Sequence, residues 1–182
     1  MPKHRIALIG LGMAVAPHAK SLIDLQDRVE VVHAFSPSAA RRNAFAEKFP
    51  FRLCDSLDTI LADRSVDAVE ILTPPNTHLD LVRQCAAAGK HILLEKPLEI
   101  STERACALVE AARTAGVTLA VMLQHRFRPA AMKLREMLRA GELGNIVGCS
   151  TVIRLWRPQS YYDLEGRGTK ARDGGGVLIT QG

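Results

Sequence analysis

The chain has few aromatic residues, widely spaced cysteines and no long apolar run. Aromatic residues make up 4% of its 182 residues, and no segment lines Lys and Arg along one helix face. The net charge of +5 therefore does not indicate a nucleic-acid partner. Without a Cys-x-x-Cys pair, neither a disulfide framework nor a clustered zinc site is indicated by the four cysteines, Cys54, Cys85, Cys106 and Cys149. We expect no bound metal.

The apolar runs are also too short to cross a membrane. The first one holds four residues and ends before Gly10, which is shorter than the core of a signal peptide or a membrane span. We therefore expect no membrane partner and a cytoplasmic location. With 47% apolar and 24% charged residues, the composition is that of a globular protein with one complete domain and part of another.

Apolar runs of strand length alternate with amphipathic stretches of helix length. This pattern predicts an α/β fold, a Rossmann-type doubly wound parallel sheet with helices on both faces. The expected strands are Arg5–Ile9, Val29–Phe35, Phe51–Leu53, Ala68–Leu72, His91–Leu94 and Val117–Met122. The expected helices are Ala14–Gln26, Ser38–Lys48, Asp55–Ala62, Thr77–Ala88 and Ser101–Ala115.

After Met122 the rhythm changes. We expect a helix at Pro129–Ala140, a long strand at Ile146–Trp156, and a final strand at Val177–Ile179 with no helix to cover it. The sequence thus predicts a dinucleotide-binding domain over residues 1–123. Residues 124–182 are expected to be the start of an α+β substrate domain, which is either truncated or completed by a partner chain.

A glycine turn follows the first expected strand. Gly10-Leu11-Gly12 opens a helix, so that free N–H groups at Gly12, Met13 and Ala14 can face a pyrophosphate. Val15 stands where the third glycine of G-x-G-x-x-G is usual, which loosens the helix-to-strand packing. The alternative is a strand-to-helix turn with no ligand.

The second expected strand is followed by Ser36, at the place where NAD-preferring domains carry an acid for the ribose 2′-hydroxyl. Arg41 and Arg42 follow, and a hydroxyl with nearby guanidinium groups suits a 2′-phosphate. The sequence therefore favours NADP over NAD. Alternatively, both arginines lie on the solvated face of the second helix.

Polar clusters follow three further strands. Thr73-Pro74-Pro75-Asn76, Glu95-Lys96-Pro97 and Gln124-His125-Arg126 all fall where open α/β sheets bind ligands. Lys96 is the leading catalytic candidate, because a partly desolvated lysine beside a cofactor can hold a substrate hydroxyl. Its alternative role is an ion pair with Glu95. Packing or surface positions are expected for His18, His33, His78 and His91, with His78 nearest the cofactor.

Together these motifs resemble the glucose-fructose oxidoreductase and inositol 2-dehydrogenase family, Gfo/Idh/MocA. The marks are the glycine turn with His18-Ala19 behind it, Thr73-Pro74-Pro75-Asn76-x-His78, Glu95-Lys96-Pro97 and Arg126-Phe127-x-Pro129-Ala130. The resemblance implies that Lys96 assists proton transfer at the nicotinamide. It implies cofactor contacts at Gly10, Gly12, Met13, Ala14, Ser36, Arg41, Thr73, Pro74, Asn76, His78, Glu95, Lys96 and Gln124, and substrate contacts at Lys96, Arg126, Trp156, Arg157 and Tyr161.

The resemblance also implies an activity. We expect an NAD(P)-dependent oxidoreductase that moves hydride between the nicotinamide and a secondary alcohol or ketone of a sugar, inositol or nucleotide sugar, in a parent enzyme that is a homo-oligomer. Family members continue from a stretch like Leu178–Gly182 into a histidine that acts as general acid and base. We therefore expect this chain to bind cofactor with weak or no turnover. A non-catalytic dinucleotide-binding sensor or regulatory module is the alternative.

Overall fold

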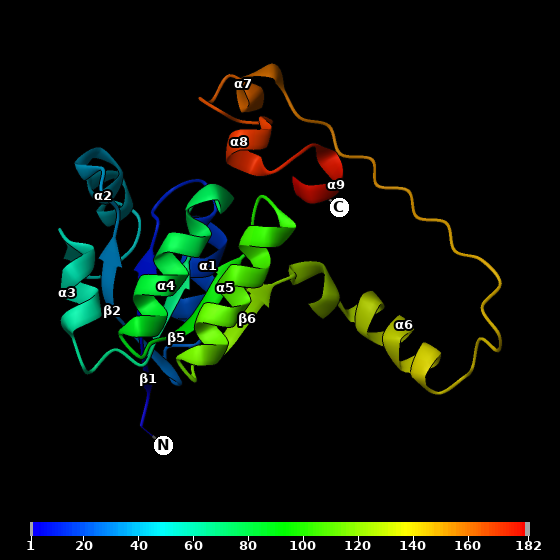
Figure 1. Ribbon diagram of the computed structural model, residues 1–182, viewed down its shortest axis with the longest axis horizontal. Helices are drawn as coiled ribbons and strands as arrows, with labels where there is room; N and C mark the ends of the chain where they lie inside the picture. The colour runs from blue at the N-terminus through cyan, green and yellow to red at the C-terminus, as the bar shows by residue number, and fades with distance from the viewer. Residues whose placement is uncertain (1, 181–182) are drawn as a thin grey trace.

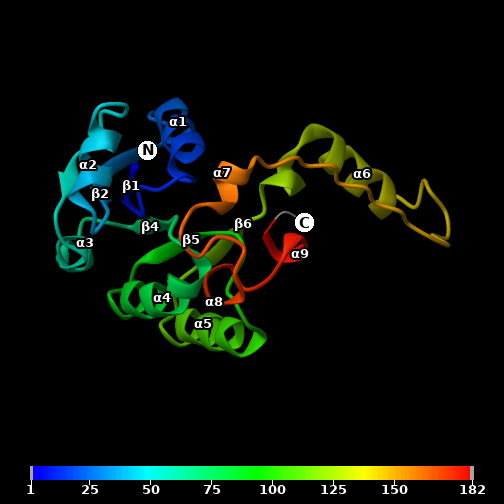
Figure 2. The ribbon, with the colours of Figure 1, turned by 90° about the horizontal axis from the view of Figure 1, so that it is seen from above.

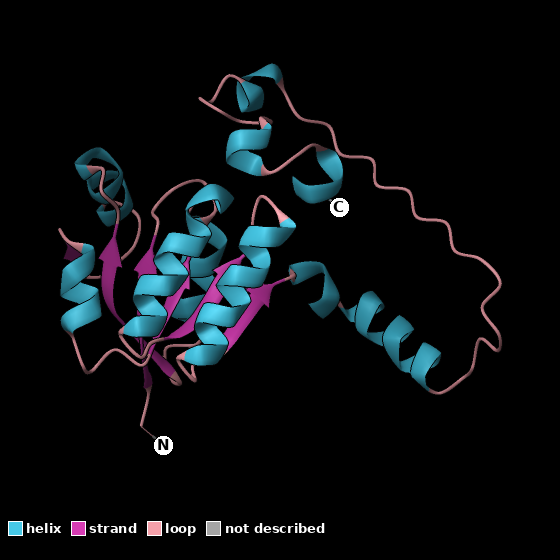
Figure 3. Cartoon of the chain, in the orientation of Figure 1, coloured by secondary structure: helices cyan, strands magenta, loops and turns pink. Residues whose placement is uncertain are grey.

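The computed structural model describes residues 2–180, except for the side chains at 177 and 178, and is built around a six-stranded sheet (Figures 1 and 3). The strand order is β3-β2-β1-β4-β5-β6, and every neighbouring pair is parallel. The strands are β1 (His4–Ile9), β2 (Val29–Phe35), β3 (Leu53–Cys54), β4 (Ala68–Ile71), β5 (His91–Glu95) and β6 (Leu119–Met122). The expected parallel α/β sheet is thereby confirmed.

Helices cover both faces of the sheet because side chains along the central strands are apolar on both sides. On β1, Leu8 packs beneath one pair of helices, whereas Ala7 and Ile9 point into the core under the other helices, and none of the three is more than 1% exposed. The first face carries α1 (Val15–Asp24) and α2 (Ala39–Ala46). The second carries α3 (Leu57–Ala62), α4 (His78–Ala87) and α5 (Thr102–Thr114).

The helices start differently, and the difference bears on ligand binding. Serine hydroxyls cap α2, α3 and α5, where Ser38, Ser56 and Ser101 accept from backbone N–H groups of the first turn. Helix α1 has no side-chain cap at Ala14 and no acid in its first turn. In its first turn the Val15 N–H donates to the Gly12 carbonyl oxygen at 3.3 Å and Pro17 has no N–H group, so Ala16 supplies the N–H group that is available to an anion.

The chain beyond β6 leaves the sheet and returns to it. A 3₁₀ turn, η2 (Gln124–Phe127), leads to α6 (Pro129–Arg139), which projects away from the sheet (Figure 1). Residues 145–158 run back without helix or strand. Three short helices, α7 (Gln159–Tyr162), α8 (Lys170–Asp173) and α9 (Val177–Thr180), then lie over the edge where the strands end (Figures 1 and 2). We call this edge the carboxyl edge.

Two of the expected strands are wrong. The segment Ile146–Trp156 is irregular, and Val177–Thr180 forms helix α9 instead of a strand. A strand needs a neighbour for its backbone N–H and C=O groups, and no strand of residues 2–180 pairs with Ile146–Trp156. Val147 is fully exposed and Val152 is 72% exposed, so this apolar pattern has no surface to pack against within the described residues.

The remaining elements follow the expectations closely. The third strand, expected at Phe51–Leu53, is shifted to Leu53–Cys54, and the helix expected at Pro129–Ala140 is α6. Within residues 2–180, no helix is both long enough and apolar enough to span a membrane.

Candidate functional site

The strand order creates a crevice at the carboxyl edge. The chain leaves β1 for α1 on one face, and it leaves β4 for α4 on the other face, so the connections diverge between these two neighbouring strands. Ligands of open α/β sheets bind at this kind of divergence. The candidate site is therefore formed by the turns that follow β1, β2, β4 and β5.

Gly10 begins the first of these turns under tight constraints. Its φ angle is +104°, a conformation that favours glycine, and its N–H donates to the Phe35 carbonyl oxygen at 2.8 Å. A Cβ atom at this position would lie 2.9 Å from the Leu72 carbonyl carbon and 2.8 Å from Thr73 Cγ2. Glycine thus lets the turns after β1 and β4 touch.

Gly12 plays a different part in the same turn. A Cβ atom at Gly12 would have nothing within 4 Å, so the space in front of α1 is open. This opening, at a helix start that no side chain caps, is the place where the sequence predicts a pyrophosphate. Met13, also an expected contact, is 59% exposed beside it, and Ala14 is the N-cap residue of α1.

The turn after β2 is organised around Ser36. The Ser36 side chain is buried, and its Oγ accepts from the Ser38 N–H at 3.4 Å. Arg42 donates through Nη1 to the Ser36 carbonyl oxygen at 2.6 Å and pairs through Nη2 with Asp55 at 3.0 Å. Arg42 thus braces the turn, while the side chain of Arg41 is exposed at the N-terminus of α2. Position 36 therefore offers a hydroxyl, and no carboxylate for a ribose 2′-hydroxyl.

The turn after β4 carries an unsatisfied amide. In the 3₁₀ turn η1 (Pro75–Thr77), the Thr77 hydroxyl lies 2.7 Å from the Thr73 hydroxyl and donates to the Pro74 carbonyl oxygen at 2.8 Å. Asn76 Oδ1 is buried and has no hydrogen-bond partner among the described residues. A buried acceptor of this kind needs a donor, and the hydroxyl and amide groups of a nicotinamide nucleoside supply donors.

His78 is not placed where a cofactor could touch it. Its ring is fully buried, with Nε2 2.9 Å from the Thr73 carbonyl oxygen and Nδ1 3.1 Å from the Leu98 carbonyl oxygen. Burial lowers the pKa of His78, against the opposing effect of these carbonyl groups. The ring therefore holds the turns after β4 and β5 together from beneath.

A buried carboxylate, which the sequence analysis missed, ties the same two turns. Glu99 accepts from the Leu79 N–H at 3.2 Å and from Arg104 Nε at 2.9 Å. Arg104 also donates to the Asn76 carbonyl oxygen at 3.1 Å. Burial tends to raise the pKa of Glu99, but the hydrogen bonds from Arg104 and the backbone outweigh it and lower the pKa. The signal in the sequence was an acid between two apolar residues, Leu98 and Ile100, just before the serine that caps α5.

Lys96 lies at the end of β5, where the Lys96–Pro97 peptide bond is cis. Its side chain is half-buried, and Nζ donates to the Thr180 carbonyl oxygen of α9 at 2.7 Å. The expected ion-pair alternative is not what the structure shows, because Glu95 pairs with His18 at 3.3 Å. The Lys96 ammonium is thus directed toward α9, which lies over the carboxyl edge.

The expected substrate residues are brought together only in part. The Arg157 guanidinium lies 5.4 Å from the centre of the Tyr161 ring, and Arg167 lies 4.7 Å from the same ring. Trp156 is 80% exposed on the irregular segment, and Arg126 lies exposed on η2, as does Gln124. Arg157 and Tyr161 therefore form one cluster above the carboxyl edge. Arg157 also donates through Nη1 to the Trp156 carbonyl oxygen at 3.2 Å, whereas the Trp156 ring and Arg126 stay exposed.

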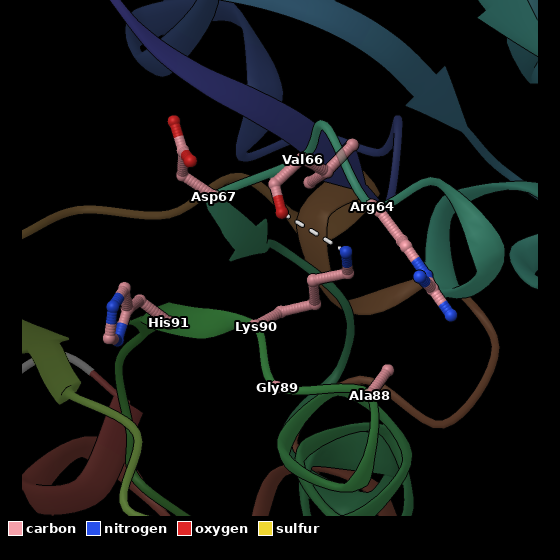
Figure 4. Close-up of a pocket in the computed structure, with 7 residues that line it drawn as sticks. All are labelled: Arg64, Val66, Asp67, Ala88, Gly89, Lys90 and His91. Carbon is pink, nitrogen blue, oxygen red and sulfur yellow. Dashed lines mark hydrogen bonds between the residues drawn. The ribbon is translucent and has the colours of Figure 1, made fainter.

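A hollow of about 290 Å³ at the opposite, amino edge of the sheet is not part of this arrangement (Figure 4). It is lined by Arg64, Val66, Asp67, Ala88, Gly89, Lys90 and His91. The ammonium group of its lysine is already hydrogen-bonded, because Lys90 Nζ donates to the carbonyl oxygens of Asp63 at 2.6 Å and Val66 at 3.1 Å. We assign Lys90 a structural role.

The chain is similar to known dehydrogenases. It is 33% identical to scyllo-inositol 2-dehydrogenase (NAD(+)) of Bacillus subtilis over 141 residues, which cover 77% of this chain and 41% of the relative. It is 35% identical to D-xylose 1-dehydrogenase (NADP(+)) 2 of Haloferax volcanii over 130 residues, which cover 71% and 40%. The chain thus spans about two fifths of the length of these relatives.

A solved structure matches nearly the whole chain. The WlbA dehydrogenase of Bordetella pertussis, crystallised with NADH and UDP-GlcNAcA, superposes with a TM-score of 0.86 at 28% identity, over 98% of this chain and 52% of that one. The family model described as an oxidoreductase family with an NAD-binding Rossmann fold matches residues 4–123. The fold, the glycine turn and this match agree: the chain belongs to the Gfo/Idh/MocA family of oxidoreductases.

Proposed function

We propose that this chain binds NADP or NAD along the carboxyl edge, as part of an oxidoreductase that acts on a sugar-like polyol. The observation that carries the proposal is the convergence of three features at one crevice. These are the open, uncapped start of α1 beyond Gly12, the unsatisfied Asn76 amide oxygen, and the Lys96 ammonium. They offer places for the pyrophosphate, the nicotinamide nucleoside and the reacting oxygen of the substrate.

In this proposal Lys96 contacts the substrate, and the cofactor carries the hydride. The nicotinamide, when bound, would supply or accept hydride at the substrate carbon. Lys96 Nζ already donates to a carbonyl oxygen in this structure, and we assign it the same contact with the substrate hydroxyl or ketone oxygen. A cation at this position stabilises the charge that develops on that oxygen as hydride moves. Glu95 stays with His18, so Lys96 is not neutralised by its neighbour in the sequence.

NADP is the preferred cofactor in this proposal. Ser36 carries no negative charge at the place where an acid would repel a 2′-phosphate. Arg41 lies exposed beside the N-terminus of α2. Arg42 is held against the Ser36 carbonyl, so its positive charge is fixed close to the same turn. The relatives include dehydrogenases named for each cofactor, NAD(+) and NADP(+).

The substrate class rests on the relatives. Those named here act on scyllo-inositol and D-xylose, and the WlbA structure contains UDP-GlcNAcA. All three compounds carry several hydroxyl groups on a ring, so a secondary alcohol of such a ring is the proposed site of oxidation. Residues 1–123 would bind the cofactor, and residues 124–182 would contribute to the substrate side.

A cofactor titration tests the proposal. NADPH and NADH are titrated into the purified chain while cofactor fluorescence is recorded. We expect NADPH to bind at least tenfold more tightly, and Ser36→Asp to reverse this preference; Ser150→Asp, on the exposed irregular segment, is the matched control. If a chain that circular dichroism shows to be folded binds neither cofactor, the proposal is wrong.

The second candidate, a non-catalytic dinucleotide-binding module, is favoured by the contact between Lys96 and Thr180, which occupies the lysine. Turnover by the chain would favour the first candidate. Reduction of NADP in the presence of inositols, D-xylose or UDP-sugars, lost in Lys96→Ala and kept in the exposed control Lys133→Ala, supports the enzyme. Tight cofactor binding without any turnover is expected both of the module and of a chain that spans only part of an enzyme.

A further inference from the structure

Three ionisable side chains meet beneath the carboxyl edge, on the face of the sheet that α1 covers. His18 of α1 lies between Glu70 of β4 and Glu95 of β5. Its Nδ1 is 2.6 Å from Glu70 Oε1, and its Nε2 is 3.3 Å from Glu95 Oε2. The three side chains are only 12%, 6% and 13% exposed. We call them the His18 cluster.

The geometry determines the charge of the ring. Nδ1 of His18 hydrogen-bonds to the Glu70 carboxylate, and Nε2 faces Glu95 Oε2 at 3.3 Å, an arrangement that favours a proton on each nitrogen. Burial by itself lowers the pKa of His18, but the hydrogen bonds and negative charges of Glu70 and Glu95 outweigh it and raise the pKa to about 9. The cluster therefore has one imidazolium between two carboxylates at neutral pH.

Strands β4 and β5 place both carboxylates on the face of the sheet that α1 covers. Glu70 pairs in register with Leu8 on one side and Leu93 on the other. Leu8 packs beneath α1 and α2, so Glu70 points to the same face, and Glu95 follows Leu93 by two positions and shares its face. Glu70 interrupts an apolar strand and Glu95 ends one, and a carboxylate that is buried at such a place costs free energy unless a cation meets it.

Stability alone is a poor reason for this arrangement. Glu70 Oε2 is buried and has no hydrogen-bond partner among residues 2–180, and Glu95 Oε2 has only the ion pair with His18. Incompletely satisfied buried ion pairs contribute little net stability compared with apolar side chains of similar size. Nor do the described residues hold any group of His, Cys, Asp and Glu placed to bind a metal ion.

The cluster does connect two functional parts of the site. Its histidine lies in the first turn of α1, directly behind the open turn at Gly12. Its second carboxylate belongs to Glu95, and the next residue is Lys96. The His18 ring thus links the helix at the open turn to Glu95, the residue directly before Lys96.

We propose that His18 is a positioning residue, which holds Glu95 and thereby sets Lys96 relative to the helix that binds the cofactor pyrophosphate. This inference rests on the proposed function. The charged groups that act on His18 are Glu70 and Glu95, from the two strands on which α1 lies. When the ring loses its proton, one carboxylate loses its partner and the link between α1 and β5 is broken.

Cofactor affinity and its pH dependence test the inference. NADPH is titrated into wild type, His18→Gln and Glu95→Gln across the pH range in which His18 titrates. We expect each variant to bind about tenfold more weakly at neutral pH. The wild-type affinity falls as the pH rises toward 9, and the variants lack this fall. Glu95→Gln leaves the 2.6 Å contact of His18 with Glu70 in place, so the test survives a failure of His18→Gln to fold.

A matched control separates positioning from general stabilisation. His33 pairs with Asp63 at 2.8 Å on the opposite face of the sheet and is similarly buried. His33→Gln is expected to lower stability and to leave NADPH affinity and its pH profile unchanged. In a double-mutant cycle, His18→Gln and Lys96→Ala together should weaken binding less than the product of their separate effects.

The outcomes are distinguishable. If wild type does not bind NADPH although circular dichroism shows it folded, the proposed function is wrong. If wild type binds and both cluster variants bind as tightly with the same pH profile, only the positioning role is wrong. Additive effects of His18→Gln and Lys96→Ala, or an equal loss of affinity in His33→Gln, also overturn the positioning role.

Discussion

The free energy of unfolding should depend on pH through His18, and the size of the effect follows from its surroundings. The pKa of His18 is raised from 6.5 to about 9 in the folded chain by Glu70 and Glu95, against the effect of burial. A raised pKa means that the folded chain holds the proton more tightly than the unfolded chain. The added stability is complete below pH 6.5 and is lost as the pH rises through about 9.

The magnitude is that of the difference between the two pKa values. Each pKa unit corresponds to about 1.4 kcal/mol, so the protonated ring contributes roughly 3 kcal/mol at low pH relative to high pH. Because the His18 side chain is only 12% exposed, solvent screens little of this interaction. This value compares the protonated ring with the neutral ring; it is not the net stability that the cluster adds relative to apolar side chains, which is small.

The assay is urea unfolding of wild type and His18→Gln, followed by circular dichroism at a series of pH values from about 6 to about 9.5. The difference between the two free energies isolates His18, because the other histidines titrate in both proteins. We expect this difference to shrink by roughly 3 kcal/mol across the range. A constant difference, or one that grows with pH, would refute the reasoning from the cluster geometry.

Three further changes test the packing around the site by the same unfolding assay. Gly10→Ala should cost roughly 2–4 kcal/mol, because its Cβ would lie 2.9 Å from the Leu72 carbonyl carbon at a φ of +104°; an unchanged midpoint would contradict this. Glu99→Ala should cost about 3–5 kcal/mol by leaving Arg104 and buried N–H groups without their acceptor; a loss below about 1 kcal/mol would show that water replaces it. Leu94→Ala should cost about 2–5 kcal/mol, because the side chain is fully buried in the sheet, and a smaller loss would mean that the core collapses around the gap.

The sheet was predictable from the sequence because its strands are buried on both faces. A run such as Ala68-Val69-Glu70-Ile71 is almost continuously apolar, and such a run indicates by its composition alone that both faces of the strand are buried. The segment Ile146–Trp156 has a similar composition but forms no strand. Strand formation requires a hydrogen-bonding neighbour as well as a pattern, and a single sequence does not say whether that neighbour exists.

The site was predictable where backbone geometry decides it. Gly10, Asn76 and Lys96 follow strands, so topology alone brings them to one edge. The role that we propose for His18 was not predicted, because a histidine on an amphipathic helix is usually a packing residue. The available signal was Glu70 itself. An acid in the middle of an apolar strand requires a cation nearby, and the helix that packs on that face of the sheet is expected to supply this cation.

Two lysines show why position in the fold, and not residue type, identifies the functional group. Lys90 and Lys96 lie at opposite ends of β5, and each donates to backbone carbonyl oxygens. Lys90 is 4% exposed and donates to two carbonyl oxygens of the turn that leads into β4, so the fold uses two of its three N–H donors. Lys96 instead reaches a carbonyl 84 residues away, at the crevice where the connections diverge. An ammonium whose partner comes from a distant segment can exchange that partner for a ligand without unfolding its own turn, which is what a substrate-binding lysine requires.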